Sequence, residues 1–186
     1  IFILFVSIKM FLNSDVYNLK CIISSVDGNK YCVRERKNID RATGLLARTT
    51  LNLEKLVNHL KSKYPDSSNV KRLVNKFNPE KIKEILPNSE YTAYSENKGE
   101  KIAFCLSSES KKDLSNLIDE NTLMFVALHE LSHVASESIG HNDEFWNNFK
   151  FILKEANDIN IYTPIDYSKD NQDYCGMKIK DNPFFS

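Results

Sequence analysis

The stretch from Leu123 to Trp146 reads LMFVALHELSHVASESIGHNDEFW, and the rest of the chain must be arranged around it. Its first half is apolar on nearly every side, which predicts a helix buried in the middle of a domain. Within that helix, the order H-E-x-x-H puts His129 and His133 on one face, a single turn apart, with Glu130 between them. Two neutral imidazoles in this arrangement predict a Zn²⁺ site, and the glutamate can reach a metal-activated water as general base.

A third histidine follows at short range. We expect Gly140 to break the helix, so that His141 can turn back toward the first two histidines. Glu144 is the rival third ligand, but carboxylates are common in the first turn of a helix, where they compensate the helix dipole. We therefore favour His141, which leaves a fourth position open for water, as in catalytic zinc sites. The alternative is that these polar residues form a buried cluster without a metal.

Length and composition indicate one globular domain. The chain has 186 residues, 41% of them hydrophobic, which is enough for a single core. Lysine plus arginine equals aspartate plus glutamate, at 25 each, so no overall positive charge is available to hold a phosphate backbone. We interpret the one basic cluster, Lys30 to Arg41, as a solvated hairpin edge rather than a nucleic-acid patch. Nucleic acid is therefore not an expected partner.

The first residues, IFILFVSIKMFL, are the most apolar part of the sequence. A membrane span needs about 20 apolar residues, so this segment fits the end of a membrane anchor, the end of a signal-peptide core, or a buried strand. We favour the anchor, because nothing later in the chain requires so apolar a leader. The expected organisation is a remnant of an N-terminal membrane anchor in residues 1–14 and a single domain in residues 15–186. The protein would be associated with a membrane through this anchor and otherwise be cytoplasmic.

Sequence periodicity predicts an α+β fold, in which a small antiparallel or mixed sheet packs on the buried helix, with additional helices around it. The expected strands are residues 19–24 and 30–36, joined as a hairpin, and residues 90–95 and 100–107. The expected additional helices are residues 39–64, 70–77 and 79–86, and one that begins after Asn142. From Asp158 onward we expect an irregular tail. His59 lies on the long helix, where a lone histidine is typically a surface or half-buried residue.

The four cysteines are expected to be mostly buried thiols, since they are too few and too widely spaced for a disulfide-stapled scaffold or a metal knuckle. They are Cys21, Cys32, Cys105 and Cys175. If residues 27 and 28 form a two-residue hairpin turn, Cys32 faces Ile23, and Cys21 lies only diagonal to it. That diagonal separation is too large for an easy bridge.

The sequences HELSH, residues 129–133, and GHNDEFW, residues 140–146, resemble the zincin metallopeptidases, and more narrowly the compact SprT-like and WLM groups. In those groups H-E-L-x-H is followed at short range by G-H and an aromatic-rich helix. The chain from Tyr91 to Pro183 is also similar to uncharacterised predicted metallopeptidases of large DNA viruses. The resemblance implies a compact zincin-like fold with zinc held by His129, His133 and His141, and with Glu130 as the base. The metzincin clan does not fit, because the gap before the third histidine is longer than its pattern H-E-x-x-H-x-x-G-x-x-H allows.

These features together predict a zinc peptidase that acts on a polypeptide substrate. We expect the substrate to add by main-chain hydrogen bonds to the sheet edge, at strand 101–106. An oxyanion partner is needed beyond the metal, and four tyrosines are candidates: Tyr91, Tyr94, Tyr162 and Tyr167. One alternative is a metal hydrolase that acts on other bonds, which would need a closed pocket rather than an open groove. The other is a catalytically inactive, membrane-tethered binding module.

Overall fold

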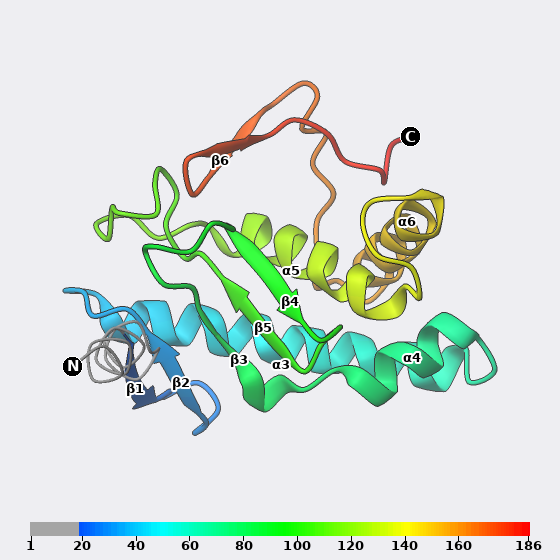
Figure 1. Ribbon diagram of the computed structural model, residues 1–186, viewed down its shortest axis with the longest axis horizontal. Helices are drawn as coiled ribbons and strands as arrows, with labels where there is room; N and C mark the ends of the chain where they lie inside the picture. The colour runs from blue at the N-terminus through cyan, green and yellow to red at the C-terminus, as the bar shows by residue number, and fades with distance from the viewer. Residues whose placement is uncertain (1–18) are drawn as a thin grey trace, which may run out of the picture.

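The computed structural model describes residues 19–186, and the expected anchor remnant in residues 1–14 lies outside this range (Figure 1). Within it, the chain combines four α-helices with small sheets, so the predicted α+β class is confirmed. Each helix within residues 19–186 is too short or too polar to span a bilayer. The core is continuous from the hairpin near the N-terminus to the C-terminal tail.

The predicted hairpin is present, but its register differs from the prediction. Strands β1 (Lys20–Ile23) and β2 (Lys30–Val33) pair antiparallel, with Ile23 opposite Lys30. The connection is residues 24–29 rather than a two-residue turn, and Ser24 N donates to Asn29 O at its base. This longer loop places Cys21 directly opposite Cys32, and the two form a disulfide. The expectation of thiols at these positions is therefore wrong.

The long helix α3 (Ile39–Lys63) matches its prediction and runs along the length of the molecule, with the hairpin at one end and α4 (Ser68–Lys76) at the other (Figure 1). The next predicted helix is wrong. Asn78 caps only a single 3₁₀ turn, η1 (Pro79–Lys81), and the chain continues as strand β3 (Ile82–Glu84). The reason is burial with a period of two, since Ile82 and Glu84 point inward while Lys83 lies between them.

The central sheet has the strand order β3-β5-β4. Strand β5 (Lys101–Phe104) pairs parallel with β3 on one side and antiparallel with β4 (Ala93–Glu96) on the other. The expectation that residues 101–106 form an edge is therefore wrong, and the last three residues of β5 are fully buried. Within the described part, β4 pairs on one side only, which makes it the edge beside α5.

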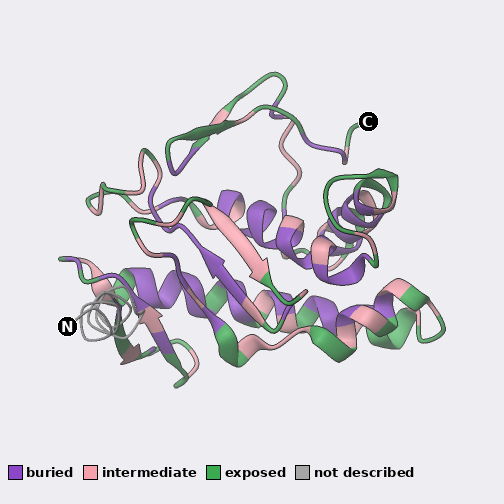
Figure 2. Cartoon of the chain, in the orientation of Figure 1, coloured by how far each residue is buried: buried purple, intermediate pink, exposed green. Residues whose placement is uncertain are grey.

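Helix α5 (Glu120–Ala135) begins as predicted, with the Asp119 carboxylate accepting from Thr122 N at 2.8 Å. It is buried along nearly its whole length (Figure 2). It ends at Ala135, well before Gly140, because the chain becomes extended at Ser136. The expectation that the glycine itself breaks the helix is therefore wrong, although Gly140 has a φ of +88° in the loop that follows.

Helix α6 (Asp143–Asp158) is capped by the Asn142 side chain, which accepts from Phe145 N at 3.1 Å, as predicted. Phe145 and Phe149 are buried against α5, but Trp146 is 43% exposed rather than part of the core. This tryptophan instead lines a mainly apolar cavity together with His129 and Glu130.

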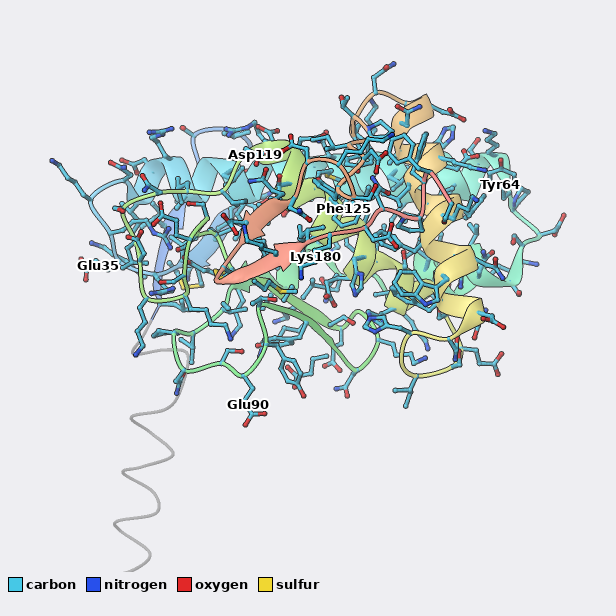
Figure 3. The ribbon with its side chains drawn as sticks, turned by 90° about the horizontal axis from the view of Figure 1, so that it is seen from above. Glu35, Tyr64, Glu90, Asp119, Phe125 and Lys180 are labelled. Atoms are coloured by element: carbon cyan, nitrogen blue, oxygen red, sulfur yellow. A yellow bond between two sulfur atoms is a disulfide. The ribbon has the colours of Figure 1, made fainter. Side chains whose placement is uncertain are left out.

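The tail is more ordered than predicted. Strands β6 (Gln172–Tyr174) and β7 (Met177–Ile179) form a hairpin that lies over α5, as the positions of Phe125 and Lys180 show from above (Figure 3). A second disulfide, Cys105–Cys175, ties this hairpin to the residue that follows β5, so the expected buried thiols are again wrong. Strands as short as β6 and β7 show too little periodicity in the sequence to be predicted from it.

The basic cluster of the first hairpin is not simply a solvated edge. Arg34 and Arg36 are both buried, and Arg36 Nη2 forms an ion pair with Glu84 Oε1 of β3. The other carboxylate oxygen accepts from Arg34 N at 2.7 Å. Burial raises the pKa of Glu84, while the two arginines and this hydrogen bond oppose that rise. The cluster joins the hairpin to the central sheet.

Candidate metal centre

Three imidazoles converge beside the C-terminal half of α5. His129 and His133 project from the helix, and His141 reaches back from the loop between α5 and α6. The Nε2 atom of His141 lies 3.0 Å from Nε2 of His129 and 3.1 Å from Nε2 of His133. Among the described residues, these three histidines form the one group of potential metal ligands, with all ligand atoms within 4.8 Å of one another.

The ring of Phe145 packs against all three imidazole rings. Its ring centroid lies 4.3 Å from that of His133, 4.6 Å from that of His141 and 4.8 Å from that of His129. Trp146, next in the chain, donates from Nε1 to the carbonyl oxygen of His141 at 3.1 Å. The first turn of α6, fixed by its Asn142 cap, thus orients all three histidines.

The donor chemistry fits a divalent metal. Burial lowers the pKa of His129 to about 3, and that of His133 to about 4, with neighbouring histidines acting in the same direction. These two rings are therefore neutral near pH 7, as ligation requires. Two nitrogens each about 2.1 Å from one tetrahedral ion lie roughly 3.4 Å apart, which is close to the separations found here. The imidazoles are thus arranged for a shared ion.

Glu130 lies on the side of α5 that faces β4. Its side chain is buried, with 6% of the residue exposed. Burial raises the pKa of Glu130 to about 7, although hydrogen bonds with the side chain and backbone of Ser95 lower it in part. Ser95 was not singled out from the sequence, since only the pairing of β4 with β5 shows that it points toward α5. A carboxylate with a pKa near neutrality suits proton transfer.

Glu144, the rival ligand, has a different role. Its carboxylate accepts from the backbone N–H groups of Glu137, at 2.8 Å, and Ser138, at 3.0 Å, and pairs with Arg72 at 3.1 Å. These hydrogen bonds lower the pKa of Glu144 to about 2. The structure therefore uses Glu144 to hold the loop that carries His141.

His59, the fourth histidine, is remote from this centre. Its Nε2 lies 2.8 Å from Glu155 Oε2, in a contact between α3 and α6. The same carboxylate accepts from Lys63 and Tyr64. His59 is half-buried, which agrees with the prediction that it is a surface or half-buried residue.

Two cavities meet at the metal centre. His129 and Glu130 line both cavities. The larger, about 840 Å³, runs along β4 and the loop of His141 and includes Tyr91 and Tyr94. The smaller, about 250 Å³, is mainly apolar and lies between α5, α6 and the β6–β7 hairpin. Of the four candidate oxyanion tyrosines, Tyr91 and Tyr94 thus border the centre. The other two are buried in the core around Phe125.

The domain is α+β, and three imidazoles converge beside a buried glutamate. This arrangement is typical of metal-dependent proteins. Residues 67–183 match the WLM domain, and the chain belongs to this zinc metallopeptidase-like, metal-dependent family. The match contains every residue of the centre.

Viral proteins are among the relatives. The chain is 31% identical over 164 residues to uncharacterized protein R325 of Acanthamoeba polyphaga mimivirus, covering 86% of this chain and 81% of the relative. It is 36% identical over 61 residues to uncharacterized protein 136R of Invertebrate iridescent virus 6, covering 33% of this chain and 34% of that protein. A 27-residue segment is 67% identical to protein 042R of Invertebrate iridescent virus 3, or 14% of this chain and 17% of that protein. No solved structure matches the chain significantly.

Proposed function

We propose that this chain is a zinc-dependent peptidase of zincin type, in which His129, His133 and His141 hold the metal and Glu130 is the general base. The observation that carries the proposal is the convergence of three imidazole Nε2 atoms beside one buried carboxylate. Zinc is the ion of choice for a ligand set of three histidines with an open fourth position. Membership of a zinc metallopeptidase-like family supports the same activity.

The residues divide the chemistry between them. A zinc ion held by the three histidines would polarise the carbonyl of a scissile peptide and lower the pKa of a water molecule. Glu130 would accept a proton as the oxygen of that water bonds to the scissile carbonyl carbon, and would deliver the proton to the amine as the C–N bond breaks. Its raised pKa, set by burial, matches a group that must both take up and release a proton near neutrality.

A polypeptide substrate is supported by the edge strand. Within the described part, β4 pairs on one side only, and the larger cavity follows its residues 93–96. An extended peptide can add there through main-chain hydrogen bonds, which carry little sequence preference. The cleft along β4, rather than β5, is therefore the proposed substrate groove. Such a groove favours a peptide over the closed pocket that a small-molecule metal hydrolase would need.

The decisive experiment compares the wild type with Glu130→Gln. The variant should keep stoichiometric zinc, because Glu130 is not a ligand, and should lose cleavage of a casein substrate by at least 100-fold, the lower range for loss of a general base (about 10²–10⁴). Zinc content measured on protein purified without chelator gives the first readout, and proteolysis of labelled casein gives the second.

Glu90→Gln serves as the matched control, since Glu90 is an exposed carboxylate ahead of β4. It should keep both zinc and activity. Equal cleavage by the wild type and Glu130→Gln would sink the peptidase assignment. Absence of stoichiometric zinc in the wild type would favour the catalytically inactive binding module instead.

A further inference from the structure

The loop that carries the third histidine is held by a lysine from a distant turn. Residues 136–142 connect α5 to α6 and contain His141. Lys98, in the turn between β4 and β5, donates from Nζ to three successive carbonyl oxygens of this loop, those of residues 136–138. The first and last of these bonds are 2.8 Å and 2.7 Å long. Together they use all three hydrogens of the ammonium group.

The opposite side of the same loop is held by an anion. Glu144 accepts from the N–H groups of residues 137 and 138, the same peptides whose carbonyls face Lys98. Arg72 of α4 donates to Ala135 O at 2.9 Å and also pairs with Glu144. The carbonyls at a helix C-terminus have no partner within the helix, so these contacts replace water at the end of α5. The loop is thus fixed from both sides before it reaches His141.

The backbone at Lys98 indicates that its side chain is used. Lys98 has a φ of +54°, in the left-handed region, between Asn97 at +48° and Gly99 at +106°. Asparagine or glycine adopts this conformation at lower cost than lysine does. Gly99 also brings the turn against α5, because a Cβ built there would lie 2.7 Å from Val134 Cγ1. A lysine kept in an unfavourable backbone position, directly beside the end of α5, is typical of a functional constraint.

We propose that Lys98 is a positioning residue for the metal centre, and that it acts through His141. This inference rests on the proposed function. Lys98 lines the larger cavity together with His133 and His141, but its ammonium group is fully engaged by carbonyls. Without it, the loop must be ordered at the moment of metal binding, and this entropic cost appears as a weaker affinity.

Lys98→Asn is the appropriate test, because asparagine suits the left-handed backbone and is too short to reach the loop. The zinc dissociation constant, measured by competition with a chelator, should rise about 10- to 100-fold, the usual effect of removing a group that orients a ligand. Lys111→Asn is the matched control. Lys111 donates to the carbonyls of Ser89 and Glu90, in a loop that supplies no metal ligand, so its loss should leave zinc affinity unchanged.

Two further variants separate positioning from folding. In a His141→Ala background, where the weaker binding by the two remaining histidines is measured by titration at raised zinc concentration, Lys98→Asn should cause no additional loss of zinc affinity, because the loop no longer supplies a ligand. Lys98→Arg, which keeps a cation able to donate to carbonyls, should recover part of the affinity. The visible spectrum of the Co²⁺-substituted protein should change in Lys98→Asn and not in Lys111→Asn.

The outcomes distinguish this inference from the proposed function. Equal zinc affinity of the wild type and Lys98→Asn would overturn the role of Lys98 alone, as would an undiminished effect in the His141→Ala background. If zinc-free Lys98→Asn protein lacks the circular dichroism spectrum of the wild type, Lys98 is needed for folding. That result would also overturn its positioning role. Failure of the wild type itself to bind zinc would overturn both proposals.

Discussion

The Nε2 atoms of His133 and His141 lie 3.1 Å apart although the two residues belong to different structural elements. His133 is fixed by α5, whereas His141 depends on a loop held by contacts from α4, the β4–β5 turn and α6. The site is therefore part rigid helix and part assembled loop. The position of His141 should therefore depend on contacts with other elements more than the positions of His129 and His133 do.

His141→Ala tests the assignment of the third ligand. With only two imidazoles left, the variant should lose stoichiometric zinc under conditions in which the wild type retains about one ion per chain. His59→Ala is the matched control, because His59 pairs with Glu155 far from the centre and should keep its zinc. Metal analysis after gel filtration provides the measurement. Retention of full zinc by His141→Ala would return Glu144 to consideration.

Local spacing accounts for the part of the site that the sequence predicts. The H-E-x-x-H pattern sets His129, His133 and Glu130 on known sides of α5, because side-chain direction within a helix follows from spacing alone. The Asn142 cap is local in the same sense, and it is confirmed. Features of this kind need no knowledge of distant contacts.

The features that the sequence missed depend on register and on long-range contacts. The observed hairpin loop adds residues 24–26 on one side of the expected turn and only residue 29 on the other, and this unequal extension moves Cys32 from Ile23 to Cys21 and so creates a disulfide. Strand β3 has an alternating burial pattern in the structure, but three residues are too few for that pattern to be recognised in the sequence, and β3 is stabilised by its pairing with β5. Ser95 and Lys98 carry no motif, and they reach the centre through the fold of the sheet.

Glu155 predicts a pH dependence of stability. Burial raises its pKa, but hydrogen bonds from Tyr64, Lys63 and His59 outweigh burial and hold the pKa below the ordinary 4.5. A carboxylate with a lowered folded-state pKa stabilises the fold above its unfolded pKa, and this contribution is lost as pH falls through the folded value. Glu155→Gln should therefore reduce the free energy of unfolding at about pH 7 by about 1.5–3 kcal/mol.

The difference between the wild type and Glu155→Gln should shrink as pH falls below 4.5 and through the lowered folded-state pKa of Glu155, because the carboxylate is then protonated and both side chains are uncharged. Urea unfolding at several pH values gives the comparison. Glu109→Gln, at a carboxylate on an exposed loop, is the control and should change stability by less than about 0.5 kcal/mol at every pH. A difference that persists unchanged at low pH would contradict the electrostatic explanation.

The two disulfides should differ in their effects. Cys105–Cys175 joins residues 70 apart, and Cys21–Cys32 joins residues 11 apart. Chain entropy predicts losses of roughly 4 kcal/mol and roughly 3 kcal/mol when the first and second bonds are removed. Replacing each pair by alanines and measuring urea unfolding tests this order.

Only the longer bridge affects a cavity at the metal centre. It ties the β6–β7 hairpin, which lines the smaller cavity beside His129. Loss of Cys105–Cys175 should therefore increase amide hydrogen exchange in residues 172–179, whereas loss of Cys21–Cys32 should not. Unchanged exchange in both variants would show that the other contacts of the hairpin hold it without the bridge.

At Gly99, the turn between β4 and β5 approaches helix α5 closely. Its φ of +106° is unfavourable for any other residue, and an added Cβ would lie 2.7 Å from Val134 Cγ1 and 3.0 Å from Lys76 O. Gly28 also has a positive φ, +74°, but open space around its Cα. Gly99→Ala should thus lower the free energy of unfolding by about 3 kcal/mol or more, against about 1 kcal/mol for Gly28→Ala.

Because relief of the overlap moves the neighbouring Lys98 away from the end of α5, Gly99→Ala should also weaken zinc binding, whereas Gly28→Ala should not. Urea unfolding and chelator competition on both variants test the two effects together, and equal results for the two glycines would contradict the close approach.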